Sequence, residues 1–478
     1  MALTGRRERA EPSGPASASD HGWRQWLAEG LFPVAGPAQP TARTVLAVAA
    51  AVAVGVWLLL LRQSGMSPLD TVWAEDGRVY LTQALQVPLG QAMFLPAGGY
   101  LQTYPRLAGA VAAELPLRLA SETLTMAAAT AAASLAVLIY VATAGHIRSR
   151  AIRAALAAAT LLAPVAGNEM LNNVANVQWY LVFAAYWVLL WRPQRLPAVA
   201  AGSGVLVLAA TSAPVSALLA PVAALRLVVV GSWRDRVLPL AFTAGLAAQL
   251  GRIATSPNPG DVGAEPGQIA GGFMLRVAAE ALAGHALTAR LWIMAGWVLP
   301  VVATAVLLGV FAYAAARRDL RCRPTVLLTG IMALLVFAAT AYLRGSGASL
   351  VWPPGSPHML SGRYAFVPVA LVLSMLAMLL DSRPPQLSAS AWRNWQVGAL
   401  AMLSFVAGQN FFVANARSAG PSWSAELAEA RASCPTDPDG TVAVPISPPP
   451  GWFAYLPCEQ VVGSGDALGP AAPRPPRR

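Results

Sequence analysis

The chain has very few charged residues. Only 12% of its 478 residues are charged and 56% are hydrophobic, with a mean hydropathy of +0.53. An average soluble domain carries roughly 25% charged residues, so this composition excludes an ordinary soluble protein. Several apolar runs approach the roughly 20 residues that cross a bilayer. The sequence therefore predicts an all-α polytopic membrane protein.

Lysine is missing altogether, so all 33 positively charged residues are Arg. We attribute this to a GC-rich coding sequence, which also favours Ala, Gly and Pro. The sequence pI of about 10.3 could indicate a nucleic-acid partner. The Arg residues lie in short segments between apolar runs, however, where the positive-inside rule explains them. We expect no nucleic-acid partner.

Cysteine and histidine are scarce, with three Cys and four His. There is no Cys-x-x-Cys pair and the His residues are widely scattered, so no metal-ligand spacing occurs. Cys322 lies in an Arg-rich turn, where we expect a reduced cytoplasmic thiol. Cys434 and Cys458 lie in a tail that we place outside, where a disulfide would contribute about 3 kcal/mol. We expect them to pair; the alternative is two free thiols.

The distribution of Arg orients the chain. Residues 1–42 combine Arg with Pro, Ser and Gly, which predicts a disordered cytoplasmic arm. The first span covers about 43–61, and residues 62–123 form the first exported loop. Within it, residues 105–120 are apolar, but a span there would place the Arg-rich turn 146–150 outside. We therefore expect an amphipathic helix that lies at the membrane interface.

Further spans follow by apolar length and Arg flanks, which makes about eleven in all. They are 124–145, 151–166, 178–191, 197–212, 215–230, 237–251, 291–315, 325–343, 364–380 and 394–412. The cytoplasmic connections would be 146–153, 191–197, 226–236, 317–324 and 381–393. With the arm, they hold more than half of the 33 Arg but only about a third of the 22 acids. This predicted topology places the N-terminus in the cytoplasm and the C-terminus on the extracytoplasmic side.

The pair 197–212 and 215–230 is short for two spans. The alternative is one long helix kinked at Ser212-Ala213-Pro214. That choice would reverse the orientation of everything downstream and place the Arg-rich turn 317–321 outside. We therefore expect two spans, within a membrane core that covers 43–412.

The tail, 413–478, is expected to form a small extracytoplasmic flap pinned by its disulfide. Residues 422–432 favour a helix, and a Pro-rich stretch and an aromatic stretch follow it. The Pro- and Arg-rich end is expected to be disordered. The function of the flap cannot be read from the sequence.

The adjacent acids Glu75 and Asp76 follow the first span, with Gly77 suited to a turn. Such a pair at a membrane surface can act as a catalytic base, ligate a metal or remain merely solvated. The sequence requires no cofactor, and a divalent metal held by the two acids stays open. Other polar residues gather on the exported side, where ionisable groups are candidates for function.

Asn168, Asn172 and Asn176 repeat every four residues, so a helix would place them on one face. Such an amide stripe can bind sugar hydroxyls, or it can bond between spans. Arg363 directly precedes an apolar span, where its planar fork suits a phosphate or reaches lipid headgroups. Arg106 invites the same two interpretations.

The exported Glu75-Asp76 loop, an interfacial helix after it and Arg363-Tyr364 opening a late span resemble the GT-C glycosyltransferases. These are polytopic enzymes, here of a bacterial type, that transfer sugar from a polyprenyl-phosphate donor outside the cytoplasmic membrane. The resemblance covers the layout of most of 43–412. It implies that Asp76, or alternatively Glu75, acts as general base or binds a metal where one is used. It also implies donor-phosphate binding by Arg363, Arg344, Arg106 and His358.

The resemblance further implies a hexosyl- or pentosyltransferase of the cell envelope, whose partners are membrane lipid, the donor and a glycan, lipid or protein acceptor. The residues expected to contact sugar or acceptor are Arg78, Tyr80, Tyr104, Asn172, Asn176, Gln178, Trp179 and Tyr364. Two alternatives stay open: a transporter or flippase of lipid-linked saccharides, and a non-catalytic envelope-assembly protein. The chain shows no clear internal repeat of the kind that transporters have.

Overall fold

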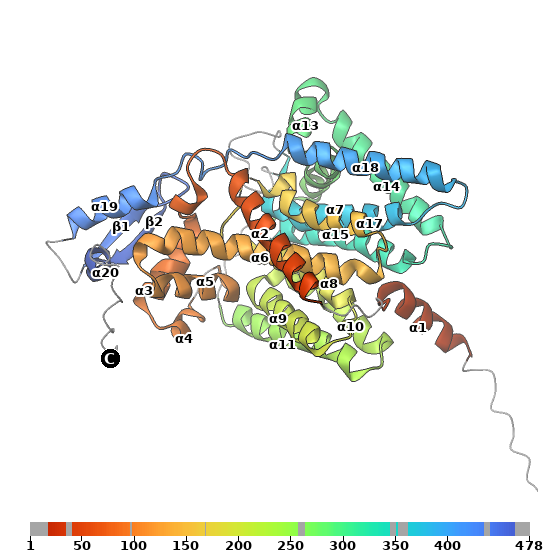
Figure 1. Cartoon of the computed structure of the whole chain (residues 1–478), viewed down its shortest axis with the longest axis horizontal. Helices are drawn as coiled ribbons and strands as arrows, with labels where there is room; N and C mark the ends of the chain where they lie inside the picture. The colour runs from red at the N-terminus through yellow and green to blue at the C-terminus, as the bar shows by residue number, and fades with distance from the viewer. Residues whose placement is uncertain are drawn as a thin grey trace, which may run out of the picture.

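The computed structural model describes residues 18–34, 41–95, 98–167, 169–256, 263–344, 350–351, 362–434 and 440–463. These residues form a helical bundle with a small mixed α/β unit at one end (Figure 1). Among them, six helices are long and apolar enough to cross a membrane, so the protein is a multi-pass membrane protein. They are Ala42–Arg62, Leu117–Gly145, Trp233–Ala254, Val298–Ala316, Arg323–Leu343 and Gly362–Asp381.

Most helices of the bundle coincide with the predicted apolar runs, whereas the helix Glu280–Ala295 begins well before the predicted span 291–315. Their bounds are α2 (Ala42–Arg62), α6 (Ala120–Ala142), α7 (Arg150–Leu162), α8 (Val177–Leu190), α9 (Leu196–Ser212), α10 (Ala220–Val229), α11 (Trp233–Ala254), α13 (Glu280–Ala295), α14 (Val298–Ala316), α15 (Arg323–Arg344), α17 (Gly362–Asp381) and α18 (Ala389–Gln409). The predicted span 291–315 is divided between α13 and α14, because Gly296 takes a positive φ of 54° there. Among the described residues six helices are both long and apolar enough to span, and the full count of about eleven stays a prediction.

The centre of the bundle is α8, whose sequence is apolar on every side. A helix of that kind lies either in a protein core or in lipid. Its residues from Trp179 to Leu190 are buried, and α6, α9 and α17 pack around it. Tyr186 hydrogen-bonds Thr329 at 2.6 Å, so the polar tip of this buried ring has a partner on α15.

The chain reverses direction between α9 and α10, as two separate segments require. At the end of α9, the carbonyl of Thr211 and the hydroxyl of Ser212 bond to the start of α5 (Thr103–Glu114). After the short turn η7 (Pro214–Leu219), Arg226 of α10 donates to the carbonyls of Leu189 and Trp191 at the opposite end of α8. The kinked single helix is therefore not what the chain forms.

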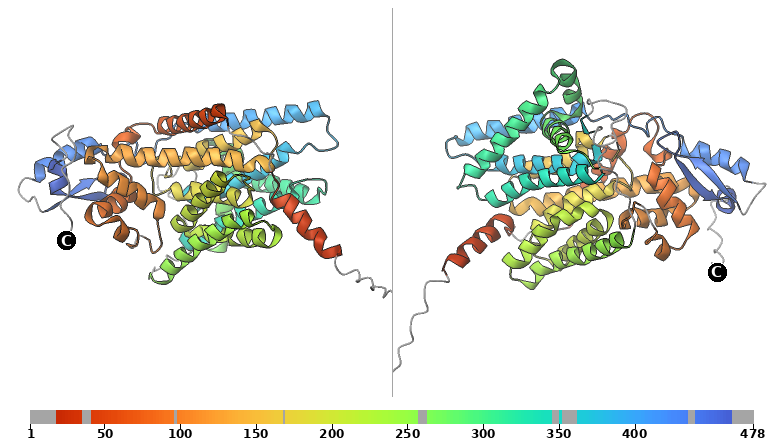
Figure 2. Two further views of the ribbon diagram at one scale, coloured as in Figure 1. Left: turned by 60° about the horizontal axis from the view of Figure 1, so that its bottom comes forward. Right: turned by 180° about the vertical axis from the view of Figure 1, so that it is seen from behind.

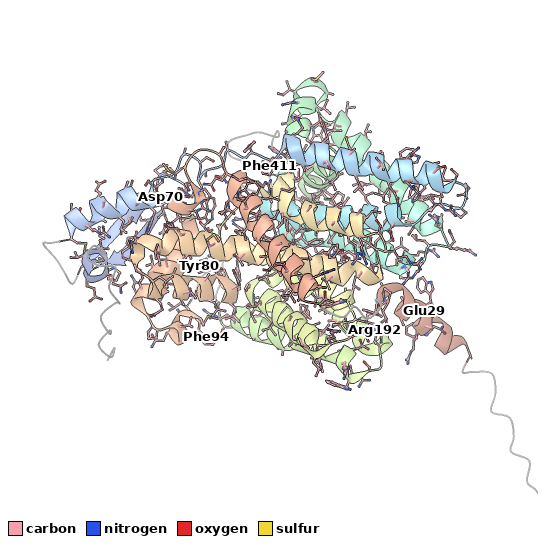
Figure 3. The ribbon with its side chains drawn as sticks, in the orientation of Figure 1. Glu29, Asp70, Tyr80, Phe94, Arg192 and Phe411 are labelled. Atoms are coloured by element: carbon pink, nitrogen blue, oxygen red, sulfur yellow. A yellow bond between two sulfur atoms is a disulfide. The ribbon has the colours of Figure 1, made fainter. Side chains whose placement is uncertain are left out.

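One end of the bundle, here called the arm end, joins the connections predicted to be cytoplasmic. Asp381 accepts hydrogen bonds from the backbone N–H groups of Arg148 at 2.7 Å and Ser149 at 2.8 Å. At the same end, Asp235 pairs with Arg192 at 2.9 Å. In Figure 3, Arg192 lies at the opposite end of the bundle from Asp70 and Tyr80. The structure brings these connections to one end, whereas the membrane side that they face stays a prediction.

The arm itself differs from the sequence expectation of disorder over 1–42. Residues Ala18–Leu31 form the helix α1, whose last residues enter the arm end. Leu31 and Phe32 are fully buried, and the carbonyl of Leu31 bonds to the ring of His146 at 3.1 Å. A few apolar side chains at the end of a polar segment are enough to anchor it. Figure 2 shows α1 and the C-terminal unit at opposite ends of the molecule.

The other end, here called the loop end, carries the first loop (62–123). It contains η2 (Pro68–Asp70), the short π-helix η3 (Asp76–Leu81), α3 (Thr82–Gln86), α4 (Leu89–Ala92) and α5, followed by η4 (Leu117–Leu119). The predicted interfacial helix is α5; its 12 residues span about 18 Å, too short to cross a bilayer. Gly109 lets α5 approach the backbone of Tyr80 closely, where a Cβ would lie 2.7 Å from that carbonyl oxygen.

The tail folds against the first loop as a compact unit, here called the cap (described residues 413–434 and 440–463). It contains α19 (Trp423–Ser433), the antiparallel strands β1 (Thr441–Pro445) and β2 (Phe453–Pro457), and α20 (Cys458–Gly463). Cys434 and Cys458 form a disulfide that ties α19 to α20. Asp70 accepts hydrogen bonds from Ser422 and Ser424 at the start of α19. Cys322 is buried and free.

Candidate active site

The two adjacent acids of the first loop have different surroundings. Asp76 opens η3 and is 2% exposed. Its two carboxylate oxygens accept hydrogen bonds from the backbone N–H groups of Val174 at 2.9 Å and Ala175 at 3.0 Å. Burial raises the pKa of Asp76 to about 7, although the two N–H groups and Arg417 act against it. Asp76 thus joins the first loop to the loop before α8.

Glu75 is half-buried and faces elsewhere. Its Oε2 is buried and has no hydrogen-bond partner among the described residues. A buried carboxylate oxygen without a partner is costly, and such groups are frequent where a ligand binds. The local π-helix that follows Glu75 is itself a form that often marks functional sites. Of the two acids, Glu75 is therefore the one with an oxygen available for chemistry.

A second carboxylate, Glu169, interacts with the charge of Glu75, and it comes from the loop before α8 (residues 169–176, here the second loop). Glu169 is 4% exposed, and its Oε2 lies 3.9 Å from Nε of Arg363. The backbone N–H of Arg363, in the first turn of α17, also binds this carboxylate. Burial raises the pKa of Glu169 to about 7; Arg363 lowers it, and the charge of Glu75 raises it further. The two acids therefore share one environment.

Arg363 is held over an aromatic surface at the start of α17. Its guanidinium carbon lies 5.2 Å from the ring centroid of Tyr364, and its Nη2 donates to the Tyr364 hydroxyl at 3.4 Å. The ring of Trp179 packs edge-on against Tyr364, with centroids 5.7 Å apart. The charges of Glu169 and Glu75 both act on Arg363. Two acids, one Arg and two aromatic rings thus meet at the loop end.

The amide residues that were expected to bind sugar are used inside the second loop. Residues 169–176 form successive turns and no helix, so they cannot present a stripe on one helical face, and Asn168 lies outside the described residues. Asn176 donates to the carbonyl of Glu169 at 3.0 Å, and Asn173 donates to the same carbonyl. Asn172, with φ of 57°, donates to the carbonyl of Leu59 at 2.9 Å. These amides hold the backbone that presents Glu169.

Several other predicted contacts also have partners within the protein. Tyr80 donates to the side chain of Gln102, and Tyr104 donates to the carbonyl of Ala127 at 2.8 Å. Gln178 donates to the carbonyl of Ala175 at 3.0 Å. These residues lie at the loop end and stabilise its turns. The charge of Glu75 also acts on the buried Tyr80.

The predicted phosphate-binding Arg residues do not form one cluster in the part of the chain that the structure describes. Arg106 is buried and donates to Gln83 and to the carbonyl of Leu95, both at 2.7 Å. Arg78, which was predicted to contact sugar or acceptor, is exposed and stacks over Trp452 of the cap, 5.5 Å from its ring centroid. The side chain of Arg344 and all of His358 lie outside the described residues. Arg363 alone of this set is placed beside the acids here.

Two residues at the loop end, Glu169 and Arg417, have contacts that the sequence did not predict. Glu169 is an acid inside an amide-rich run, and that contrast is the local signal that marks it. Arg417 of the cap is fully buried next to the second loop, and no local pattern marks it. Among the described residues, no group of three or more His, Cys, Asp or Glu is close enough to hold a metal ion.

Comparisons with known proteins add one finding. No protein-family model and no curated protein matches the chain. Among solved structures, it is similar to the crystal structure of ArnT from Cupriavidus metallidurans bound to undecaprenyl phosphate. The match covers 78% of this chain and 76% of that chain, with 15% sequence identity and a TM-score of 0.39.

Proposed function

We propose that the chain is an integral-membrane glycosyltransferase. It would move a sugar from a polyprenyl-phosphate donor to a cell-envelope acceptor on the extracytoplasmic face. The observation that carries the proposal is the ion pair of Glu169 and Arg363 at the loop end, on which the charge of Glu75 also acts. Each of the two acids keeps a buried Oε2 without a hydrogen-bond partner in the described part of the chain. Ionisable groups held at the edge of an apolar bundle are expected to be functional.

The chemistry needs a proton acceptor and a cation. In a single displacement, Glu75 takes the proton of the acceptor hydroxyl while the acceptor oxygen bonds to the anomeric carbon. The bond from that carbon to the phosphate oxygen breaks, and the polyprenyl phosphate leaves with the electron pair. Arg363 stabilises the negative charge that develops on the phosphate, because its planar fork can donate two parallel hydrogen bonds. A single displacement inverts the anomeric configuration.

Glu75 is preferred over Asp76 as the base because of their partners. Both oxygens of Asp76 already accept backbone N–H groups, and a base must have an oxygen within reach of the acceptor hydroxyl. Glu169 would act as the counter-ion of Arg363 until the donor phosphate arrives. It would also set the orientation of the guanidinium, because the ion pair and the stacking on Tyr364 restrain it from two sides.

The test is sugar transfer in membranes that contain the wild-type chain or one of four variants. A mixed pool of radiolabelled hexosyl and pentosyl polyprenyl phosphates serves as donor, with and without EDTA. The variants are Glu75→Gln, Asp76→Asn, Glu169→Gln and Arg363→Ala, and Glu429→Gln on exposed α19 is the matched control.

We expect wild type and Glu429→Gln to label envelope material, and Glu75→Gln to fail while expressing normally. If Asp76→Asn loses sugar transfer while Glu75→Gln keeps full activity, the general base is Asp76 and not Glu75. If wild type transfers label from no donor, the enzyme proposal fails. Flipping of lipid-linked saccharides would then be assayed in reconstituted vesicles, because a transporter would move the intact lipid without breaking the anomeric bond.

A further inference from the structure

Arg417 is the most extensively bonded side chain at the loop end among those described above. It follows the last helix of the bundle, opens the cap and is 1% exposed. Its Nη2 donates to the carbonyls of Thr71 at 2.7 Å and Pro68 at 2.8 Å, and its Nε donates to the Thr71 hydroxyl at 3.1 Å. Its Nη1 donates to the carbonyl of Asn172. One guanidinium therefore binds both loops that carry the candidate acids.

The positions of these carbonyls explain why the contacts matter for the site. Thr71 lies shortly before Glu75 in the first loop, and Asn172 lies shortly after Glu169 in the second. Arg417 also donates to the hydroxyl of Thr125 near the start of α6, at 3.1 Å. That bond fixes the guanidinium to the rigid bundle. The spacing between the two loops is thus set from a third element, which is the chain after α18.

Asp76 holds the same two loops from the other side. Its bonds to Val174 and Ala175 fasten the second loop two and three residues beyond Asn172, whose carbonyl Arg417 binds. The opposite charges of Asp76 and Arg417 attract each other across the buried space between the loops. An unpaired charge at this depth would be strongly destabilising, so each of the two needs the other. The second loop is therefore fastened on both sides, between Glu169 and α8.

We infer that Arg417 is a positioning residue for the proposed transfer, and that the cap is a structural part of the site. Arg417 fixes the separation between Glu75 and Glu169. Glu75, as the base, and Glu169, as the counter-ion of Arg363, then face the same donor molecule. This inference rests on the proposed function of those residues. A planar fork with donors in fixed directions is required, because six acceptor atoms from three segments surround it. Lysine would keep the charge and lose that geometry.

Two measurements on the full-length chain test the inference. The first compares the kcat and KM of Arg417→Lys with those of wild type, using Arg118→Lys on exposed η4 as the matched control. Arg417→Gly is assayed in addition with and without ethylguanidine. We expect kcat to fall about 100-fold in Arg417→Lys, as a misplacement of about 1 Å can cause, while the donor KM changes little. Ethylguanidine should restore part of the rate of Arg417→Gly.

The second measurement does not depend on activity. Glu75→Cys and Glu169→Cys are combined in one chain and treated with a short bifunctional thiol reagent, with Arg417 intact or replaced by Lys. We expect the cross-link yield to fall several-fold in the Arg417→Lys background. Formation of the Cys434–Cys458 disulfide is checked in every variant, because it reports that the cap has folded.

The outcomes separate the two proposals. If Arg417→Lys leaves both kcat and cross-linking unchanged, the positioning role is wrong even when Glu75→Gln is inactive. If its loss of rate matches a loss of folded protein and ethylguanidine gives no recovery, Arg417 serves folding only and the inference is also wrong. If the cross-link depends on Arg417 but the wild-type chain transfers no sugar, the positioning stands and the proposed transferase fails.

Discussion

Glu169 and Arg363 face each other across the gap between the second loop and the first turn of α17, with 3.9 Å between Oε2 and Nε. At that distance the two side chains form an ion pair, but Nε does not donate a hydrogen bond to Oε2. The two charges therefore attract each other without a hydrogen bond between Oε2 and Nε. The negative charge of Glu75 also acts on Arg363. A phosphate that approaches Arg363 would replace these carboxylates as its anionic partner. The relationship leads to the predictions that follow.

Glu75→Gln and Asp76→Asn should produce different defects. Loss of a general base costs roughly 10²- to 10⁴-fold in rate, so Glu75→Gln should lose transfer and keep its melting temperature. Asp76→Asn replaces an acceptor oxygen by an N–H₂ group that faces a backbone N–H, which should cost about 1–3 kcal/mol of stability. Thermal unfolding in detergent and transfer assays on the same preparations separate the two effects. Equal stability in both variants would contradict this division.

The stability of the protein should depend on pH through Asp76 and Glu169. The pKa of each is raised to about 7 in the folded state. The folded chain therefore binds these protons more tightly than the unfolded chain. Their contribution to stability is fully present below the ordinary carboxyl pKa of about 4, and it is lost as the pH rises through about 7. Glu169→Gln should flatten the melting temperature between pH 4.5 and 7.5, as scanning calorimetry or dye-based unfolding can measure.

Arg363→Lys and Arg363→Ala should both weaken donor use, but to different degrees. Lysine keeps the charge and loses the bidentate geometry and the stacking on Tyr364. We expect an increase of about tenfold in donor KM for Arg363→Lys and a larger loss in kcat/KM for Arg363→Ala. Steady-state assays with one purified donor give both constants. An unchanged KM in both variants would exclude Arg363 as the phosphate contact.

The disulfide should stabilise the cap more than the bundle. Cys434 and Cys458 are separated by 24 residues, for which loop-closure entropy predicts a contribution of about 3 kcal/mol. The double replacement Cys434→Ser/Cys458→Ser should make the cap sensitive to protease while the bundle stays resistant. Limited proteolysis followed by mass spectrometry of the fragments tests this. If the cap holds the two loops, transfer should fall together with cap integrity.

The layout of the helices could be predicted because it depends on local properties. A run such as 325–343 is long and apolar whatever surrounds it, and the Arg flanks mark where it ends. The helix after Pro421-Ser422 was predictable for the same reason, since Ser422 caps it locally by accepting from the N–H of Ala425. The arm was misjudged over Ala18–Leu31 because its order comes from burying Leu31 and Phe32 against distant helices.

The roles of the acids depended on contacts between distant parts of the chain. By itself the sequence determined that Glu75 and Asp76 stand together at the end of a membrane helix, with Arg363 opening another. Only the tertiary structure decided that Asp76 accepts hydrogen bonds from the backbone N–H groups of Val174 and Ala175. It also decided that the charge of Glu75 acts on Glu169. Neighbouring carboxylates are chemically alike, so their pKa values and availability are set by the N–H groups and charges that the fold brings to them. Those partners come from segments far apart in the chain, which no local pattern records.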